Sequence, residues 1–121
     1  MPTLNQSPGK AELTNRIKME LRRLHIPGNI RGFNYLTYML LDVIPNPGRL
    51  MLITKNFYPD TARAFGVPWF HVERSVRTAI SISWNRGGRE MLDQMACHHL
   101  DERPTATQVI DIVADYIRRT S

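Results

Sequence analysis

The sequence predicts an all-α fold of about six helices that contains a helix-turn-helix. Apolar residues recur at helical spacing in most segments, and no part of the chain offers a persuasive set of paired strands. The 121 residues are 42% hydrophobic, which is enough for one domain with a single modest core. We therefore expect a flexible tail at residues 1–10 and one domain at residues 11–121.

Helical spacing predicts the first two helices. At residues 11–25, apolar positions fall on one face, with charges on the other; these are Leu13, Ile17, Leu21 and Leu24. Pro27-Gly28 ends this helix. A second helix is expected at residues 32–44, with an apolar face of Tyr35, Met39, Leu40 and Val43. The run from Pro45 to Gly48 ends it.

The middle of the chain leaves two interpretations open. Residues 49–57 start a third helix that either continues to Phe65 or is interrupted by Pro59, because proline is tolerated only at a first turn or a kink. In the second interpretation a separate helix opens near Tyr58. Gly66-Val67-Pro68 then forms a turn.

Residues 70–84 alternate polar and apolar residues at their end, as a strand does, but a helix separates the two classes better. At about 100° per residue, one face collects Val72, Val76, Ala79, Ile80 and Ser83. The opposite side collects His71, Arg74, Thr78, Ser81 and Asn85, with Glu73 and Arg77 flanking the seam. Small Ala79 and Ser83 on the inner face would allow another helix to approach closely.

Two further helices complete the predicted fold. A short one covers residues 89–99. After Pro104, Thr105 and Gln108 form a capping box that opens the last helix. Its expected buried face is Val109, Ile112, Val113 and Tyr116, and Arg118 and Arg119 stand at its C-terminal end, where positive charge is favourable.

Charge and cysteine usage narrow the function. The net charge is +5, and thirteen of the 16 basic residues are arginine, the residue best suited to phosphate and guanine edges. This balance is typical of a nucleic-acid binder, although any soluble protein with a high isoelectric point shares it. The chain has no apolar run near the ~20 residues needed to cross a bilayer and no signal peptide. With Cys97 as the only cysteine, it can form no internal disulfide, which fits a cytoplasmic location.

The residues around the predicted turn have the spacing of a helix-turn-helix. A small Ala62 allows close crossing, Gly66 permits a positive φ, and Val72 fills the angle between the helices. The early residues of the second helix would enter the major groove, namely Phe70, His71, Glu73, Arg74, Arg77 and Thr78. Arginine can donate to guanine and glutamate can accept from cytosine. The alternative is an ordinary i,i+4 ion pair of Glu73 and Arg77 on a solvated face.

The other polar side chains are better suited to contacts with nucleic-acid phosphates than to catalysis. Expected phosphate contacts are Lys55, Arg63, Arg86, Arg89 and backbone N–H groups near Phe70, with Arg31 a weaker candidate. Trp69 and Phe70 either pack under the helix-turn-helix or touch sugars and thymine methyl groups. Cys97-His98-His99 has no second cluster of metal ligands elsewhere in the sequence, so we expect no bound metal. No nucleophile and base stand in a catalytic arrangement, so we expect neither a cofactor nor enzymatic activity.

Three motifs resemble the C-terminal DNA-binding domain of stage zero sporulation protein A, a response regulator. They are TKNFYPDTARAF, VERSVRTAI and SWNRG, and similarity extends over residues 14–119. The resemblance implies a winged-helix-like effector domain without a wing, which binds double-stranded promoter DNA and regulates transcription at the start of sporulation. A homodimer on tandem sites and RNA polymerase are further expected partners; a membrane is not.

By position, the resemblance implies that Glu73, Arg74 and Arg77 face the DNA. Two neighbouring positions, usually arginine and histidine in the family, are His71 and Thr78 here. Both departures remove a positive or potentially positive group. They motivate an alternative hypothesis, in which the domain is a protein-interaction module of a sporulation-like regulator with weakened or lost DNA binding. The family's receiver domain would not fit within 121 residues.

Overall fold

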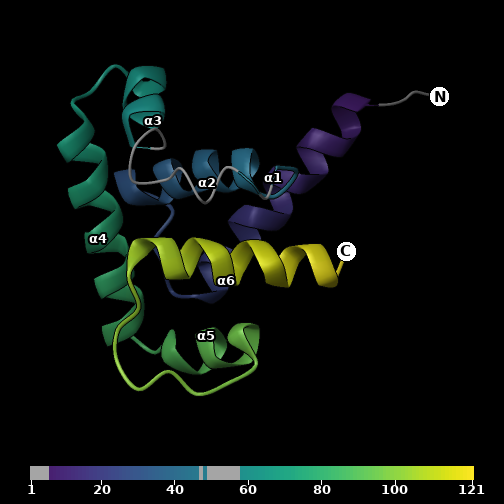
Figure 1. Ribbon diagram of the computed structural model, residues 1–121, viewed down its shortest axis with the longest axis vertical. Coiled ribbons are helices and arrows are strands. Elements are labelled where there is room, and N and C mark those ends of the chain that lie inside the picture. The colour runs from purple at the N-terminus through teal and green to yellow at the C-terminus, as the bar shows by residue number, and fades with distance from the viewer. Residues whose placement is uncertain (1–5, 47, 49–57) are drawn as a thin grey trace.

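The computed structural model describes residues 6–46, 48 and 58–121, and within them the fold is all-α with six helices and no strand (Figure 1). This confirms the predicted fold class. The helices are α1 (Gln6–Arg23), α2 (Arg31–Val43), α3 (Tyr58–Phe65), α4 (Trp69–Asn85), α5 (Arg89–Ala96) and α6 (Ala106–Arg119). None of those that the structure describes is long and apolar enough to span a bilayer. The helix predicted at residues 49–57 falls outside the described residues.

The core forms around α2, which contacts α1, α3, α4 and α6. Its predicted inner face is confirmed, because Tyr35, Met39, Leu40 and Val43 are all buried. On α1, Ile17, Leu21 and Leu24 are buried and Leu13 packs partly against them. Helical periodicity therefore identified the core-facing sides of both N-terminal helices.

Three predicted boundaries or faces are wrong. The helix α1 begins at Gln6 rather than residue 11, with Pro8 in its first turn, where proline is tolerated. The helix α5 ends at Ala96 rather than residue 99, because Cys97 adopts a left-handed conformation with φ of 63°. On α6, Ile112 and Tyr116 are only partly buried; the fully buried residues are Val109, Ile110, Val113, Ala114 and Ile117.

The crossing of α2 over α4 is very close. All five predicted inner residues of α4 are buried, which confirms its orientation. A Cβ added to Gly32 of α2 would lie 2.4 Å from the Ser75 carbonyl oxygen and 2.8 Å from the Ala79 Cβ. The small residues thus let the backbones meet, as predicted, and they fix the angle at which α4 leaves the core.

Hydrogen bonds fix both ends of α6. The predicted capping box is present: Gln108 N donates to Thr105 Oγ1 at 3.2 Å, and Thr105 N donates to Gln108 Oε1 at 2.8 Å. At the other end, the Arg118 guanidinium donates to the carbonyl oxygens of Val43 and Ile44, each at 2.9 Å. Arg118 therefore caps the C-terminus of α2 as well as ending its own helix.

Candidate nucleic-acid interface

A tight turn joins α3 to α4. Gly66 adopts φ of 67°, the left-handed conformation that favours glycine. Val67 N donates to the Ala62 carbonyl at 3.0 Å, and Gly66 N donates to the Arg63 carbonyl at 3.3 Å. These two bonds form a Schellman motif, which satisfies the last carbonyls of α3. Pro68 then takes an extended conformation as the N-cap of α4.

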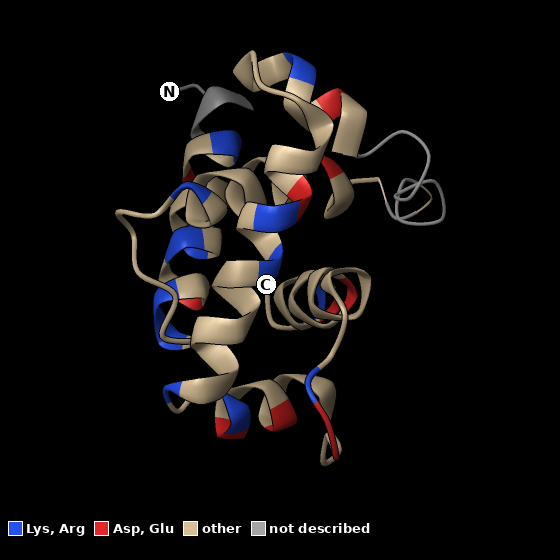
Figure 2. Ribbon diagram, turned by 90° about the vertical axis from the view of Figure 1, so that its left-hand side faces the viewer, with Lys and Arg blue, Asp and Glu red and all other residues tan. Residues whose placement is uncertain are grey.

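The two helices of this unit pack as the spacing predicted. Ala62 on α3 and Val72 on α4 are both buried, and the two helices contact each other. Val67 packs partly against the same core from the turn. The α3–turn–α4 unit is therefore a helix-turn-helix whose second helix buries its inner side. The backbone of α4 lies toward the viewer in Figure 2.

Arg74 and Thr78 lie on the outer side of α4, and both are exposed. They are one helical turn apart and share a face. Arg74 makes no ion pair with any carboxylate that the structure describes. Its guanidinium can thus donate to a ligand at the second turn of α4.

Glu73 and Arg77 form an ion pair, with Arg77 Nη2 2.7 Å from Glu73 Oε1. The ordinary i,i+4 ion pair, which the sequence offered as the alternative to base recognition, is therefore present in the protein without DNA. Tyr58 lies beside this pair, and burial, followed by the negative charge of Glu73, raises the pKa of the Tyr58 phenol, while Arg77 opposes the shift. The pair borders a shallow cleft between α4 and the start of α6, which also includes Arg103 and residues 104–107.

His71 is placed differently from Arg74 and Thr78. Its ring packs edge-on against the ring of Tyr35 on α2, with centroids 5.9 Å apart. Its Nε2 atom is buried and has no hydrogen-bond partner in the described structure. The side chain is only partly exposed, so His71 lies at the margin of the outer face, toward α2.

The expected backbone contacts are spread over the helix-turn-helix and beyond it. Arg63 is exposed beside the turn and pairs with Asp60 at 3.2 Å. Arg86, the C-cap of α4, is exposed at the opposite end. Arg89 is engaged by the fold, because its Nε donates to the Trp84 carbonyl at 3.0 Å and its guanidinium lies over the Trp84 ring. Lys55 lies outside the described residues.

The structure adds a basic cluster that the sequence did not single out. Arg22, His25 and Arg86 line a shallow depression around Pro27 and Gly28, where the end of α1 meets the end of α4. The Arg22 guanidinium lies over the Phe33 ring with its carbon 5.2 Å from the centroid, and neither arginine has an ion-pair partner among the described carboxylates. Figure 2 shows basic residues on both α4 and the helices beside it. Nothing local in the sequence links positions 22 and 86.

The histidine-rich segment after α5 is a loop held in place by hydrogen bonds to Asp93. Leu100 N donates to Asp93 Oδ1 at 2.9 Å, and His99 Nδ1 lies 2.9 Å from Asp93 Oδ2. The backbone N–H of Leu100, and then the His99 hydrogen bond, lower the pKa of the Asp93 carboxyl. No group of three or more His, Cys, Asp or Glu side chains suited to a metal occurs in the described part of the chain.

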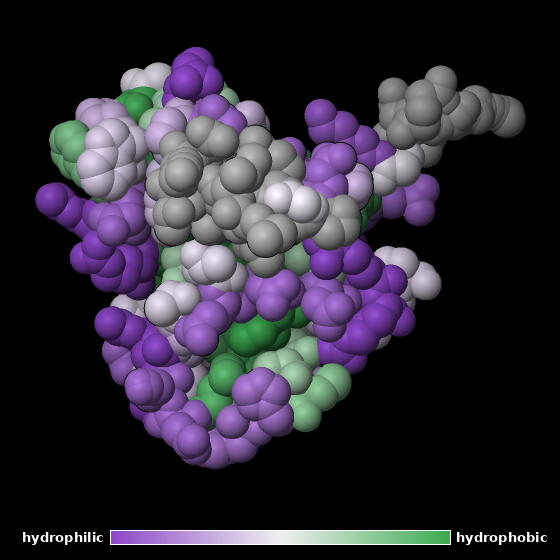
Figure 3. Space-filling model, viewed as in Figure 1, coloured by the Kyte–Doolittle hydropathy of each residue, from purple (hydrophilic) through white to green (hydrophobic). Residues whose placement is uncertain are grey.

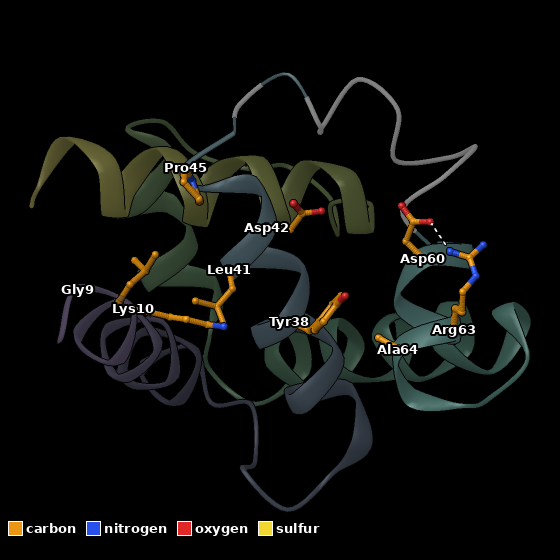
Figure 4. Close-up of a pocket in the computed structure, with 10 residues that line it drawn as sticks. Gly9, Lys10, Tyr38, Leu41, Asp42, Pro45, Asp60, Arg63 and Ala64 are labelled. Atoms are coloured by element: carbon orange, nitrogen blue, oxygen red, sulfur yellow. Dashed lines mark hydrogen bonds and ion pairs between the residues drawn. The ribbon is translucent and has the colours of Figure 1, made fainter. Parts of the chain in front are cut away.

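A groove of about 890 Å³ lies between α1, α2 and α3 (Figure 4). Its floor is apolar, with Leu13, Tyr38 and Leu41, and its rim carries Lys10 and the Asp60–Arg63 pair. Among the described residues that line it, none is a serine, cysteine or histidine. The groove therefore presents no nucleophile–base pair of the kind that covalent catalysis uses.

One family model matches most of the chain. It is described as sporulation initiation factor Spo0A C terminal, and it matches residues 17–117. The matched range includes the whole of α2, α3, α4 and α5, residues 17–23 of α1, and all but the last two residues of α6.

Proposed function

The chain belongs to the sporulation initiation factor Spo0A C-terminal family, whose members are DNA-binding regulators and not enzymes, and we propose that it binds a specific promoter sequence through α4. One observation carries the proposal: the helix-turn-helix presents the outer side of α4 to solvent, and Arg74 in its second turn pairs with no described carboxylate. In such units the second helix enters the major groove.

Four side chains would contact the bases. Arg74 would donate two hydrogen bonds to O6 and N7 of a guanine. The Glu73–Arg77 pair would open on the DNA, so that Glu73 accepts from a cytosine amine and Arg77 donates to a second guanine. Opening costs little, because exposed ion pairs contribute on the order of 0–1 kcal/mol. Thr78, one turn after Arg74, would add a hydroxyl or methyl contact.

Backbone contacts would flank these bases. The free N–H groups in the first turn of α4, around Phe70, would meet a phosphate at the positive end of the helix dipole. Arg63 would contact a phosphate near the turn, Arg86 one near the far end of α4, and Arg31 remains a weaker candidate. Arg22 and His25 extend the Arg86 site. Arg89 would contribute mainly by holding Trp84.

Further partners follow from the family and stay predictions. We expect a homodimer on tandem promoter sites, contact with RNA polymerase and a cytoplasmic location. The expected domain organisation, a tail at residues 1–10 before a domain at residues 11–121, is likewise a prediction, apart from the earlier start of α1 at Gln6.

A second candidate function is a protein-interaction module with weakened DNA binding. Its support is the placement of His71, whose Nε2 is buried against α2 rather than free to donate to DNA, together with the neutral Thr78. Arg74 argues against it, since its guanidinium in the second turn of α4 stays exposed.

A binding titration across a salt series separates the two functions. The protein would be titrated into a duplex carrying the promoter box selected from random DNA, and into a scrambled duplex of equal length. We expect tighter binding to the selected box and a steep fall of affinity with salt, because phosphate contacts release counterions. If neither a sequence preference nor a salt slope is observed, the DNA-binding proposal is wrong.

A further inference from the structure

Two large aromatic side chains are exposed at the start of α4. Trp69 is 55% exposed and Phe70 is 51% exposed, although each belongs to a residue type that usually covers apolar surface in a core. Their rings meet edge to face, with centroids 6.1 Å apart. Neither side chain packs against the hydrophobic core, and neither makes another ring contact within the described structure.

This exposure decides between the two roles that the sequence left open for these residues. Side chains packed under the helix-turn-helix would be buried, and these are not. Phe65, at the end of α3, provides a contrast: it is 41% exposed, but its ring packs against Tyr35 at 4.9 Å and Tyr38 at 5.6 Å. Phe65 therefore packs against aromatic rings of α2, whereas within the described structure the rings of Trp69 and Phe70 contact only each other.

Phe70 lies in line with the proposed base-reading residues. Phe70, Arg74 and Thr78 are spaced four residues apart, so they form one stripe along the outer side of α4. The stripe begins in the first turn, and the N-terminal residues of a recognition helix are those that contact base edges. Figure 3 shows this end of the molecule at upper left, with apolar and near-neutral atoms directly above the hydrophilic atoms of α4.

The surroundings fit a nucleic acid better than a protein. Two side chains cover far less than the roughly 800 Å² per partner of a stable protein interface. The same stripe continues into Arg74, and helix N–H groups point outward beside the rings, which favours a ligand that carries negative charge. On the major-groove edge of DNA, the C5-methyl of thymine is the apolar group available to an aromatic side chain.

We propose that Phe70, held in place by the edge of Trp69, contacts the C5-methyl of a thymine next to the base pair that Arg74 reads. The inference rests on the proposed function, since it requires α4 to enter the major groove. It assigns to the aromatic pair a share of sequence specificity that hydrogen bonding does not supply.

Replacing thymine by deoxyuridine tests the contact, because uracil keeps the base pair and O4 but lacks the methyl group. Each thymine of the selected box would be replaced in turn, and binding would be measured by fluorescence anisotropy. We expect the wild-type protein to lose about fourfold in affinity at one thymine, the value of one buried methyl group. Phe70→Ala should bind the thymine and uracil duplexes equally, and Trp69→Ala should reduce the ratio.

Met19→Ala is the matched control, because Met19 is a large apolar side chain on α1 with a similar exposure of 48%. It should keep the fourfold ratio. If uracil has no effect at any position, or if Phe70→Ala keeps the wild-type ratio, the methyl contact is refuted while sequence-specific binding stands. Loss of all sequence preference by the wild-type protein would instead refute the proposed function itself.

Discussion

Arg74 and Arg77 are three residues apart on α4, yet their electrostatic situations differ. Arg77 is paired with Glu73 at 2.7 Å, whereas Arg74 has no described carboxylate partner. Arg77 must leave an existing partner to reach DNA, and Arg74 need not. The guanidinium of Arg74 is therefore the side chain on which base recognition should depend most directly.

Arg74→Ala should weaken binding to the selected box by about 1–3 kcal/mol and relax preference at one base pair. The side chain is exposed, so the variant should fold with unchanged thermal stability. The measurement is a set of binding titrations against every single-base variant of the box. Equal weakening on every duplex would show that Arg74 contacts only phosphate.

Gly66 fixes the direction in which α4 leaves the turn. Gly66→Ala should destabilise the domain by about 1 kcal/mol, because alanine disfavours φ of 67°. Nothing lies within 4 Å of the added Cβ, so backbone strain alone would account for the loss. Urea denaturation measures it. Cys97→Gly provides the converse control: Cys97 has φ of 63° and is exposed, and glycine there should not destabilise.

The sequence predicted individual residues well where helix geometry alone decides, and less well where another helix intervenes. Rotation along α4 placed Val72, Val76 and Ala79 inward, and they are buried. The same rotation placed His71 outward, but the close α2 crossing brings Tyr35 against its ring. A single-helix projection contains no information about such a neighbour.

At the level of elements, α2 and α4 pack closely because the residues at their crossing have small side chains or none. Gly32 faces the Ser75 carbonyl and Ala79 across the crossing, with no space for a methyl group. The orientation of α4 against the core therefore depends on this contact.

Gly32→Ala should destabilise the domain by about 1–3 kcal/mol, because its Cβ would lie 2.4 Å from the Ser75 carbonyl oxygen and the helices would have to separate. Thermal denaturation followed by circular dichroism measures the effect. Gly9→Ala in α1 is the control, since nothing lies within 4 Å of its added Cβ; it should be neutral or slightly stabilising. Equal stability of Gly32→Ala and wild type would contradict the close packing.

Helix ends were harder to predict than helix faces. The capping box at Thr105 is a local signal, and it placed the start of α6 correctly. The end of α5 depends on Cys97 adopting a left-handed conformation, which few residues other than glycine, asparagine and aspartate signal. The start of α1 at Gln6 lies well before Ile17, its first buried residue among the side chains that the structure describes, so no apolar periodicity marks it.

On the scale of the whole molecule, the arginines that the structure describes include some that hold the fold and others that pair with no described carboxylate. Arg118 and Arg89 donate to main-chain carbonyls, and Arg16 pairs with the buried carboxylate of Glu20. Arg22 and Arg86 lie far apart in the sequence but meet around Pro27, without described acidic partners. Only the folded arrangement of α1 and α4 creates this cluster, so local sequence patterns could not reveal it.

If Arg22 and Arg86 contact phosphates that flank the box, each contributes to the salt dependence of binding. Arg22→Gln and Arg86→Gln should each reduce the slope of log K against log salt by about 1, because each phosphate contact releases about one counterion. The loss should be equal on the selected and scrambled duplexes, since phosphates carry no sequence. Lys10→Gln removes the same charge at the groove between α1, α2 and α3, and should leave the slope unchanged. An unchanged slope for Arg22→Gln and Arg86→Gln would mean that DNA does not reach this cluster, and that its path across the domain is confined to α3 and α4.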